Sequence, residues 1–242
     1  MDILISEEKG VRMLHFGSDW VQGAMRIARP YALELEYTRE MMLPLLFRTD
    51  NAWPKNALFI GLGVGALPKF LHKHRPNSRI TVAEISPEVL AVAQMHFKLP
   101  PLSMHFNVEI MCGAQYLAET KRTFDLIMVD GFDGNAKVGP LNSSAFYLTL
   151  KSRLAADGIV VANLLSNRKD SEPNKQRFRD AFDNNVLILP PCSSGNLVAM
   201  ACAGGQWGIN KADLIPQVSV LKDETGLNLG ASASKLQALV GS

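Results

Sequence analysis

A chain of 242 residues with a formal net charge of +2 is long enough for one large α/β domain, with or without a small appendage. The charge is too small to indicate a nucleic-acid partner, and no apolar stretch approaches the roughly 20 residues that cross a membrane. The three cysteines form neither an even disulfide framework nor a metal-binding spacing, and the N-terminus lacks the basic start and apolar core of a signal peptide. We therefore expect a cytoplasmic protein without a metal site.

Residues 1–50 differ from the rest of the chain in their pattern of apolar residues and glycines. Short, partly alternating apolar runs separated by glycines predict a small antiparallel β segment. Residues 34–47 then have the apolar spacing of a helix, in which Pro44 marks a bend or a late start. We predict a small N-terminal β/helical segment over residues 1–50 and a catalytic domain over residues 51–242. The apolar runs are residues 3–5, 12–16 and 20–27.

Residues 57–84 have the pattern strand, glycine turn, helix, strand. Gly61, Gly63 and Gly65 form the turn, and such glycines let the backbone come close to a ligand at the N-terminus of the helix. The second strand ends on Glu84, whose carboxylate can accept both ribose hydroxyls, and its spacing from the turn fits the roughly 20 residues expected. The stretch therefore predicts an adenosine-binding site, although the glycine pattern alone does not choose the cofactor.

Strands and helices continue to alternate after this unit, which is typical of a doubly wound, mostly parallel sheet. The last two strands flank a short Pro/Gly/Ser link, so we expect a hairpin and one antiparallel strand near the end. The predicted fold class is therefore α/β and Rossmann-like. Further helices are predicted at residues 87–97, 114–120, 143–154, 174–182, 211–222 and 233–240, and further strands at residues 108–111, 124–129, 158–163, 186–189 and 197–202.

Polar residues follow several of these strands, and ligands bind beyond the carboxyl ends of the strands in open α/β sheets. That rule selects Glu84, Cys112 and Asp130, with Asp133 shortly after. A carboxylate over a nucleoside site can hold a cationic amine or take its proton. The alternative is that the two aspartates cap the next helix or form Asx-turns. Tyr37 by itself fits an ordinary core tyrosine.

Nine short motifs follow one another along the chain. They are V-Q-G (21–23), E-Y-T-R-E-M-M (36–42), I-G-L-G-V-G-A-L (60–67), A-E-I-S-P-E-V (83–89), F-K-L-P (97–100), F-D-L-I-M-V-D-G-F-D (124–133), G-P-L (139–141), A-F-Y (145–147) and N-L-L (163–165). Together, from about residue 12 to residue 165, they resemble the spermidine synthase (polyamine aminopropyltransferase) family, and more closely its bacterial spermidine-synthase-like branch.

The resemblance implies a fold and a reaction. The fold is a class I methyltransferase-type α/β domain behind a small N-terminal β-domain. The reaction transfers the aminopropyl group of decarboxylated S-adenosylmethionine to a polyamine such as putrescine and leaves methylthioadenosine. The partner is therefore a small-molecule amine, with no metal, nucleic acid or membrane involved. A homodimer stays open, because the family often pairs through its N-terminal part and this one is short.

The resemblance also assigns roles to individual residues. Asp130 would orient and deprotonate the attacking amine with help from Tyr37, and Asp133 and Glu34 would bind the substrate. Glu84 would hold the ribose. The predicted cofactor contacts are Gln22, Gly61, Gly63, Gly65, Glu84, Cys112 and Gly113.

Four residues depart from the family pattern and keep alternatives open. Val64 stands where typical spermidine synthases have the aspartate that holds the aminopropyl nitrogen, and Cys112 replaces the aspartate that contacts adenine. Leu33 and Glu34 stand in place of an acidic pair. One alternative is a methyltransferase that uses intact S-adenosylmethionine, and another is a non-catalytic homologue that binds methylthioadenosine or a related nucleoside. A nicotinamide oxidoreductase has less support, because nothing else indicates hydride chemistry.

Overall fold

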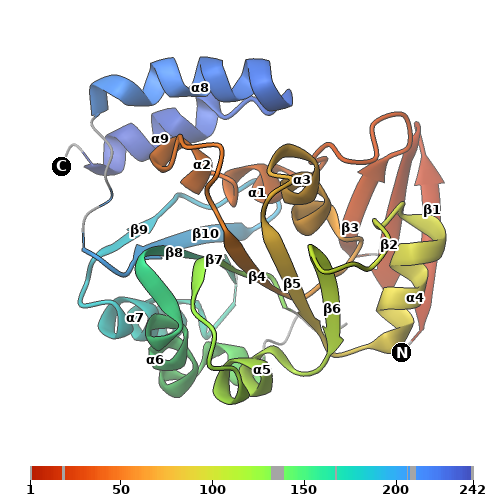
Figure 1. Ribbon diagram of the computed structural model, residues 1–242, viewed down its shortest axis with the longest axis horizontal. Helices are drawn as coiled ribbons and strands as arrows, with labels where there is room; N and C mark the ends of the chain where they lie inside the picture. Colours follow the sequence, from red (N-terminus) through yellow and green to blue (C-terminus); the bar gives the residue numbers. More distant parts are fainter. Residues whose placement is uncertain are drawn as a thin grey trace.

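The computed structural model describes residues 2–17, 20–131, 139–166, 168–205, 207 and 211–240, the side chains of residues 211 and 240 excepted. Within these ranges a small antiparallel sheet stands beside a large mixed sheet that is covered by helices (Figure 1). The small sheet consists of β1 (Ile3–Glu8), β2 (Val11–Phe16) and β3 (Val21–Arg26). The large sheet consists of β4 (Asn56–Ile60), β5 (Arg79–Glu84), β6 (Phe106–Ile110), β7 (Phe124–Val129), β8 (Leu154–Leu165), β9 (Val186–Ile188) and β10 (Asn196–Cys202).

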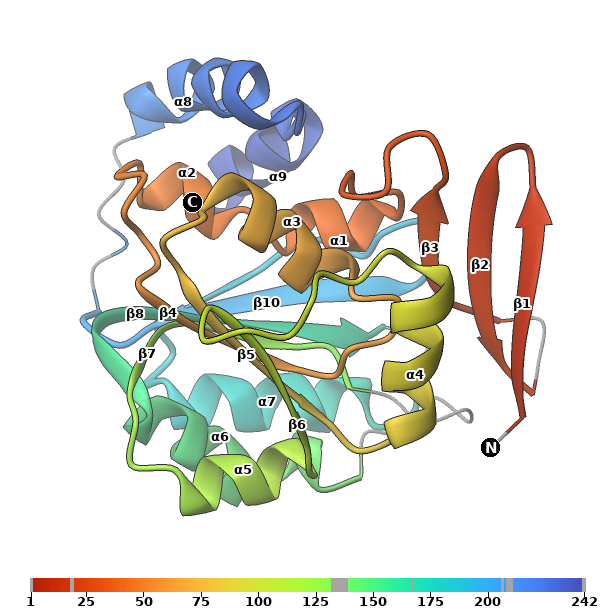
Figure 2. The same cartoon turned by 45° about the vertical axis from the view of Figure 1, so that its right-hand side comes forward.

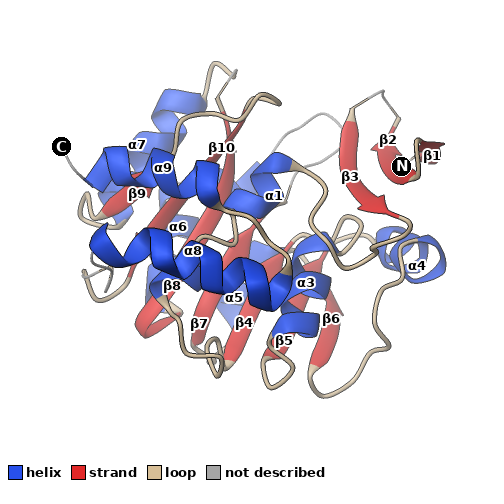
Figure 3. Cartoon of the chain, turned by 90° about the horizontal axis from the view of Figure 1, so that it is seen from above, coloured by secondary structure: helices blue, strands red, loops and turns tan. Residues whose placement is uncertain are grey.

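The helices form a layer on each face of the large sheet (Figures 1 and 3). One layer contains α1 (Glu36–Glu40), α2 (Pro44–Phe47), α3 (Ala66–His74), α8 (Lys211–Thr225) and α9 (Gly230–Val240). The other contains α5 (Gly113–Glu119), α6 (Ser144–Ser152) and α7 (Ser171–Ala181). A short 3₁₀ turn, η1 (Gly139–Asn142), precedes α6. α4 (Pro87–His96) lies between β6 and the small sheet (Figure 2).

The strand order of the large sheet is β6-β5-β4-β7-β8-β10-β9. All strands run in the same direction except β10, which is antiparallel to both β8 and β9. β10 pairs with both β8 and β9, which is the late hairpin that the Pro/Gly/Ser link predicts. The predicted fold class, a mostly parallel Rossmann-like sheet with one antiparallel strand near the end and a short N-terminal β segment, is confirmed.

The central strands are apolar throughout because helices cover both faces of the sheet. Along β4, Ala57 and Phe59 join the core under α3, whereas Leu58 and Ile60 join the core under α5 and α6. Successive strand residues point to opposite faces, so a continuous apolar run serves two cores at once. This arrangement leaves only the ends of the strands for polar side chains.

The segment predicted as one helix over residues 34–47 is two short helices. α2 begins at Pro44, which is tolerated in the first turn of a helix because its missing N–H has no partner there. Met41, Met42 and Leu43 form the turn before it and are fully buried. These side chains belong to the same core as the large sheet. Whether residues 1–50 form a unit of their own stays a prediction.

Two further features bear on the sequence-based expectations. Among the described residues, no helix is both long and apolar enough to cross a membrane. All three cysteines carry free thiols.

Candidate active site

Four residues stand at one level on the carboxyl edge of the large sheet. The pairing registers of β5, β4, β7 and β8 align the positions that follow Ala83, Ile60, Val129 and Ala162. Those positions are Glu84, Gly61, Asp130 and Asn163. The acids selected by the strand-end rule therefore meet at the same edge.

Gly61 makes this alignment sterically feasible. Its φ is +95°, and a Cβ there would lie 2.3 Å from the carbonyl oxygen of Asp130. The Asp130 N–H donates to the Ile60 carbonyl oxygen at 2.9 Å, so the turn after β4 is pressed against the end of β7. A side chain at this position would push the two strand ends apart.

A cavity of about 790 Å³ opens above this row of residues. Its walls come from β3, the glycine turn, the strand ends, α1 and the link between β9 and β10. The predicted site residues that line it are Gln22, Glu34, Tyr37, Gly61, Gly63, Glu84, Cys112, Gly113 and Asp130.

Of the two other predicted site residues, Gly65 is described and is not part of this lining. Gly65 is the N-cap of α3 with a φ of +69°, and a Cβ there would meet the side chain of Leu99. It shapes the turn from behind and does not face the cavity. Asp133 lies outside the described residues, and its predicted role in substrate binding stays a prediction.

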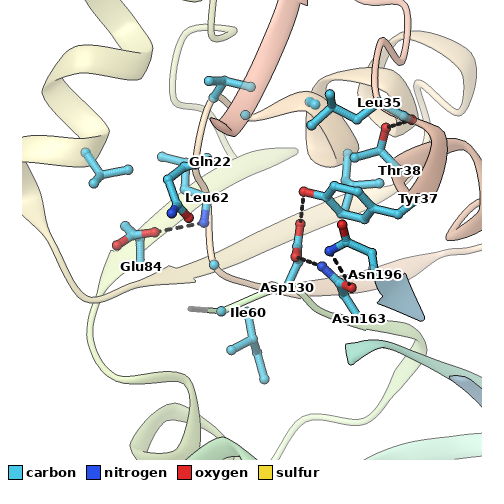
Figure 4. A pocket seen from close by; sticks show the side chains of 18 of the residues that line it. Gln22, Leu35, Tyr37, Thr38, Ile60, Leu62, Glu84, Asp130, Asn163 and Asn196 are labelled. Atoms are coloured by element: carbon cyan, nitrogen blue, oxygen red, sulfur yellow. Dashed lines mark hydrogen bonds between the residues drawn. The ribbon is translucent and has the colours of Figure 1, made fainter. Parts of the chain in front are cut away.

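Glu84 lies at one end of the cavity and is held by backbone groups. Its Oε2 accepts a hydrogen bond from the Leu62 N–H at 2.8 Å (Figure 4). Its Oε1 accepts one from the Ser86 N–H at 2.9 Å. The side chain is only 7 % exposed, and this burial raises the pKa of its carboxyl although the backbone bonds oppose the shift. A carboxylate offers about four acceptor sites, so capacity remains for a ligand hydroxyl.

Asp130 lies toward the other end and is held by side chains. Its Oδ1 accepts from Asn163 Nδ2 at 2.8 Å and its Oδ2 from the Tyr37 hydroxyl at 3.2 Å (Figure 4). Asn196 Nδ2 donates to Asn163 Oδ1 at 3.0 Å, which turns the Asn163 amide so that its NH₂ faces the aspartate. Burial raises the pKa of Asp130, and the two donors lower it in part. The group is therefore an oriented acceptor with increased basicity.

The role open to Tyr37 follows from its surroundings. Burial, together with the charge of Asp130 and the hydrogen bond to it, raises the pKa of Tyr37 well above its usual value. The phenol therefore stays protonated and donates its hydrogen bond. It can orient the aspartate, but it cannot serve as the base.

Two predicted contact residues have distinct settings. Glu34 is already paired with Arg26 of β3, through a 3.0 Å bond from Arg26 Nε to Oε2 and a second from Nη2 to Oε1. Cys112 is the half-buried N-cap of α5, and the next residue, Gly113, packs so closely on Ile60 that a Cβ would lie 2.3 Å from its Cγ2 atom. The roles assigned to these residues stay predictions.

Val64, in the middle of the glycine turn, makes an apolar contact with the small sheet. It is 2 % exposed and belongs to a cluster with Leu14, Met25 and Phe97. A Cβ on Gly23 of β3 would lie 2.8 Å from both Val64 methyl carbons. Where the family resemblance predicts an aspartate for the aminopropyl nitrogen, this chain thus has a buried valine that packs the glycine turn against the small sheet.

Sequence reasoning missed two residues of the site, Asn163 and Asn196. Asn163 ends the strand predicted at residues 158–163, so the strand-end rule that selected Asp130 also applies to it. Asn196 starts β10, whose antiparallel direction brings its first residue to the carboxyl edge of the parallel strands. The polar network of the site therefore depends on the one antiparallel strand.

Comparison with known proteins gives concordant results. A model of the spermine/spermidine synthase domain matches residues 35–203. A polyamine aminopropyltransferase of Neisseria meningitidis serogroup A / serotype 4A is 35 % identical over 237 residues, which cover 98 % of this chain and 89 % of the relative.

Two solved structures have a similar fold. Human methyltransferase-like protein 13, in complex with SAH, superposes with a TM-score of 0.71 at 22 % identity, over 80 % of this chain and 93 % of the other. A spermidine synthase in complex with the transition-state analogue AdoDATO superposes with a TM-score of 0.64 at 19 % identity, over 93 % and 88 % of the two chains. The domain match and the nearly full-length identity show that the chain belongs to the spermine/spermidine synthase family and is, by homology, a polyamine aminopropyltransferase-like protein.

Proposed function

We propose that the chain transfers the aminopropyl group of decarboxylated S-adenosylmethionine to a primary amine of a polyamine such as putrescine, with methylthioadenosine as the second product. The observation that carries the proposal is the shared edge of Glu84, Gly61, Asp130 and Asn163 in one cavity. Glu84, at one end, suits the nucleoside of the donor. Asp130, at the other end, suits the amine of the acceptor, which has to lose a proton. The AdoDATO complex of a spermidine synthase with the same fold supports the choice of donor.

The donor half of the cavity holds the nucleoside. Glu84 accepts the ribose hydroxyls, Gln22 and the backbone at Gly61 and Gly63 contact the donor, and Cys112 and Gly113 border the base. The cavity of about 790 Å³ leaves room for an acceptor beyond the nucleoside. The carboxylate of Glu84 is buried and is anchored by backbone N–H groups. It still has free acceptor sites, so it is better suited to bind sugar hydroxyls than to bind a hydrated ion.

The acceptor half supplies a base. A sulfonium is already an activated leaving group, so the enzyme needs alignment and a free amine lone pair. The amine nitrogen bonds to the aminopropyl carbon next to sulfur, that carbon–sulfur bond breaks, and its electron pair stays on the thioether sulfur. The proton of the amine passes to Asp130, which Asn163 and Tyr37 hold in place. Asp133 and Glu34 bind the remainder of the amine.

Turnover and ligand binding test the proposal together. We expect methylthioadenosine to raise the melting temperature and NAD to leave it unchanged, since a ligand of the native state stabilises it by mass action. We expect turnover of putrescine with decarboxylated S-adenosylmethionine, and a loss of about 10²- to 10⁴-fold in Asp130→Asn, the usual contribution of a general base. Asp157→Asn, an exposed substitution on β8 outside the cavity lining, is the control. A shift with NAD alone, or full turnover in Asp130→Asn, would refute the proposal.

A methyltransferase that uses intact S-adenosylmethionine is the second candidate, and Val64 is the observation that favours it. The buried valine offers no acceptor to the ammonium group of a decarboxylated donor. Transfer of a labelled methyl group from S-adenosylmethionine to a cell extract, with no turnover of the decarboxylated donor, would select this alternative. Binding of methylthioadenosine without either transfer would select the non-catalytic alternative.

We also propose a cytoplasmic location. Three free thiols, two of them buried, suit a reducing compartment.

A further inference from the structure

A lysine near the C-terminus reaches the helix that carries Tyr37. Lys235 of α9 donates from Nζ to Glu40 Oε1 at 2.7 Å and to Glu36 Oε1 at 3.3 Å. α9 and α1 lie on the same face of the large sheet, although 195 residues separate Lys235 from Glu40 (Figure 3). Ala233 and Leu236 anchor α9 in the main core on either side of the lysine. The lysine is therefore fixed at both its backbone and its charged end.

The two glutamates lie four residues apart on α1, where side chains share one helix face and like charges repel. Glu40 is 1 % exposed, so its charge has no access to water, and Cys192 Sγ donates to its Oε2 at 3.2 Å. Burial raises the pKa of the Cys192 thiol to about 12, so it remains neutral. Among the described residues, the Lys235 ammonium is the cation that forms an ion pair with both glutamates, and its charge reduces the repulsion between them.

This cluster also has the composition of a metal site. The ligand atoms of Glu36, Glu40 and Cys192 lie within 4.8 Å of one another. However, the ammonium of Lys235 already donates a hydrogen bond to each of the two carboxylates. Burial opposes the charge on Lys235, but its bonds to Glu40 and Glu36 outweigh this and raise its pKa, so the lysine keeps its proton. Lys235, Glu36 and Glu40 therefore form an ion-pair cluster, called the clamp below.

The clamp grips α1 on both sides of Tyr37. α1 is only five residues long, and its N-cap, Leu35, makes no side-chain capping bond. So short a helix is not stable by itself and depends on tertiary contacts for its position. The Tyr37–Asp130 bond is 3.2 Å, beyond the usual range for O–H···O bonds, so a small displacement of α1 would break it.

We infer that Lys235 is a positioning residue, whose ammonium holds Glu36 and Glu40 on one face of α1 and thereby keeps the Tyr37 hydroxyl on Asp130. The residue lies beyond the matched synthase domain, which ends at residue 203. The inference rests on the proposed function only in the final step, where Asp130 takes a proton from the amine. The geometric part holds whether or not the chain turns over.

Two measurements on Lys235→Met test the clamp without turnover. By hydrogen exchange, we expect the amides of residues 36–40 to exchange faster than in the parent protein. By NMR titration of the aspartate carboxyl carbons, assigned with Asp130→Asn, we expect the pKa of Asp130 to rise as far as it does in Tyr37→Phe, because both variants remove the same donor. We expect Lys235→Arg to restore both values, and Lys222→Met, an exposed lysine of α8, to change neither.

A double-mutant cycle then separates positioning from stability. If Lys235 acts through Tyr37, the kcat loss of Lys235→Met, about fivefold for one hydrogen bond, disappears in the Tyr37→Phe background, while KM for the donor is unchanged. Glu40→Gln combined with Lys235→Met removes the buried charge of Glu40 together with its partner, so the double variant can be measured if Lys235→Met alone unfolds. Unchanged exchange at residues 36–40, an unchanged pKa of Asp130, or additive losses in the cycle would each overturn the inference. An inactive parent protein would refute the proposed function and leave the exchange and titration results to decide the clamp.

Discussion

The two carboxylates of the cavity are held in opposite ways. Glu84 is fixed by backbone N–H groups of Leu62 and Ser86, which lie in the turns directly after β4 and β5. Asp130 is fixed by the side chains of Tyr37 and Asn163, which lie 93 and 33 residues away in the sequence. One anchor is thus built into the strand–turn–helix unit itself, and the other is assembled from α1, β8 and β10.

The difference has a functional meaning. A backbone anchor cannot rotate away, which suits a group that only has to grip a sugar. Side-chain donors can be tuned or displaced, and each of them lowers the pKa of Asp130, so the basicity of this aspartate is adjustable by residues far from it in the chain. The donor end is therefore held by the backbone of the strand–turn–helix unit, and the acceptor end depends on side chains that single substitutions can remove.

Glu84→Gln changes the carboxylate that the backbone anchors, and it has the largest expected effect on nucleoside binding. The amide loses the charge that strengthens the bonds to ribose hydroxyls, and its NH₂ group would face one of the backbone N–H donors. We expect the affinity for methylthioadenosine to fall about 10- to 100-fold, the worth of a hydrogen bond to a charged group. Isothermal titration calorimetry measures this directly.

The control for this substitution is Glu88→Gln, an exposed glutamate four residues further along the chain, in the first turn of α4. It should leave the affinity unchanged. Equal affinities for the parent protein and Glu84→Gln would mean that the nucleoside does not contact this carboxylate, and the donor half of the proposal would fail.

The same contrast explains what sequence reasoning could reach. Glu84 and the glycine turn are local features, and their spacing alone predicts their place in the fold. Asp130 was selectable because it ends an apolar strand. The same rule applies to Asn163, one of the two partners of Asp130. Tyr37 instead has the pattern of a core residue, and Asn196 reaches the site only because β10 runs antiparallel. The resemblance to the family supplied Tyr37, and no pattern supplied Asn196.

Helix boundaries were limited by a different cause. The apolar spacing over residues 34–47 predicts one helix, but Met41, Met42 and Leu43 satisfy the same burial in a turn. Periodicity reports which side chains are buried and not whether the backbone between them stays helical. Tertiary packing against the core decided the conformation there.

Asn163→Leu removes the central donor of the adjustable end. Asp130 Oδ1 and Asn196 Nδ2 both lose their partner, and an unpaired buried polar group costs about 1–3 kcal/mol of the free energy of unfolding. At about 2–4 °C per kcal/mol for a chain of this size, the melting temperature should fall by about 5 °C. The pKa of Asp130 should rise, because a donor to its ionised form is lost.

Asn107→Leu is the matched comparison, since it deletes an exposed amide–carboxylate bond, to Glu109 on the edge strand β6. Its free energy of unfolding should stay within about 0.5 kcal/mol of that of the parent protein, as for surface substitutions in general. Equal losses in the two variants would show that the network around Asp130 carries no special weight.

Asp130→Asn should stabilise the protein while it removes activity. Burial raises the folded-state pKa of Asp130 above its unfolded value, so the folded state binds the proton more tightly. The free energy of unfolding therefore falls as the pH rises from the unfolded to the folded pKa, so the ionised aspartate destabilises the folded protein at neutral pH. Asparagine avoids that cost, and the Tyr37 hydroxyl can accept as well as donate, so both contacts persist.

We expect the free energy of unfolding to rise by about 1 kcal/mol at pH 7, a typical gain for a single stabilising substitution. The gain should vanish below the unfolded pKa of aspartate, where the carboxyl is protonated in both states. Urea unfolding of the two proteins across this pH range is the measurement. A variant that is less stable than the parent at pH 7 would mean that the donors outweigh the burial.

Tyr37→Phe has the smallest expected effect and is the most specific probe of the adjustable end. The tyrosine bond is 3.2 Å against 2.8 Å for Asn163, so its loss should raise the pKa of Asp130 by less than Asn163→Leu does. The acidic limb of the kcat/KM profile should move to higher pH in the same order, because only the ionised aspartate can take the amine proton. On the alkaline plateau the loss should be about fivefold or less, the worth of one ordinary hydrogen bond. An acidic limb that moves to lower pH, or a plateau loss as large as that of Asp130→Asn, would mean that the phenol itself carries the proton, which its raised pKa argues against.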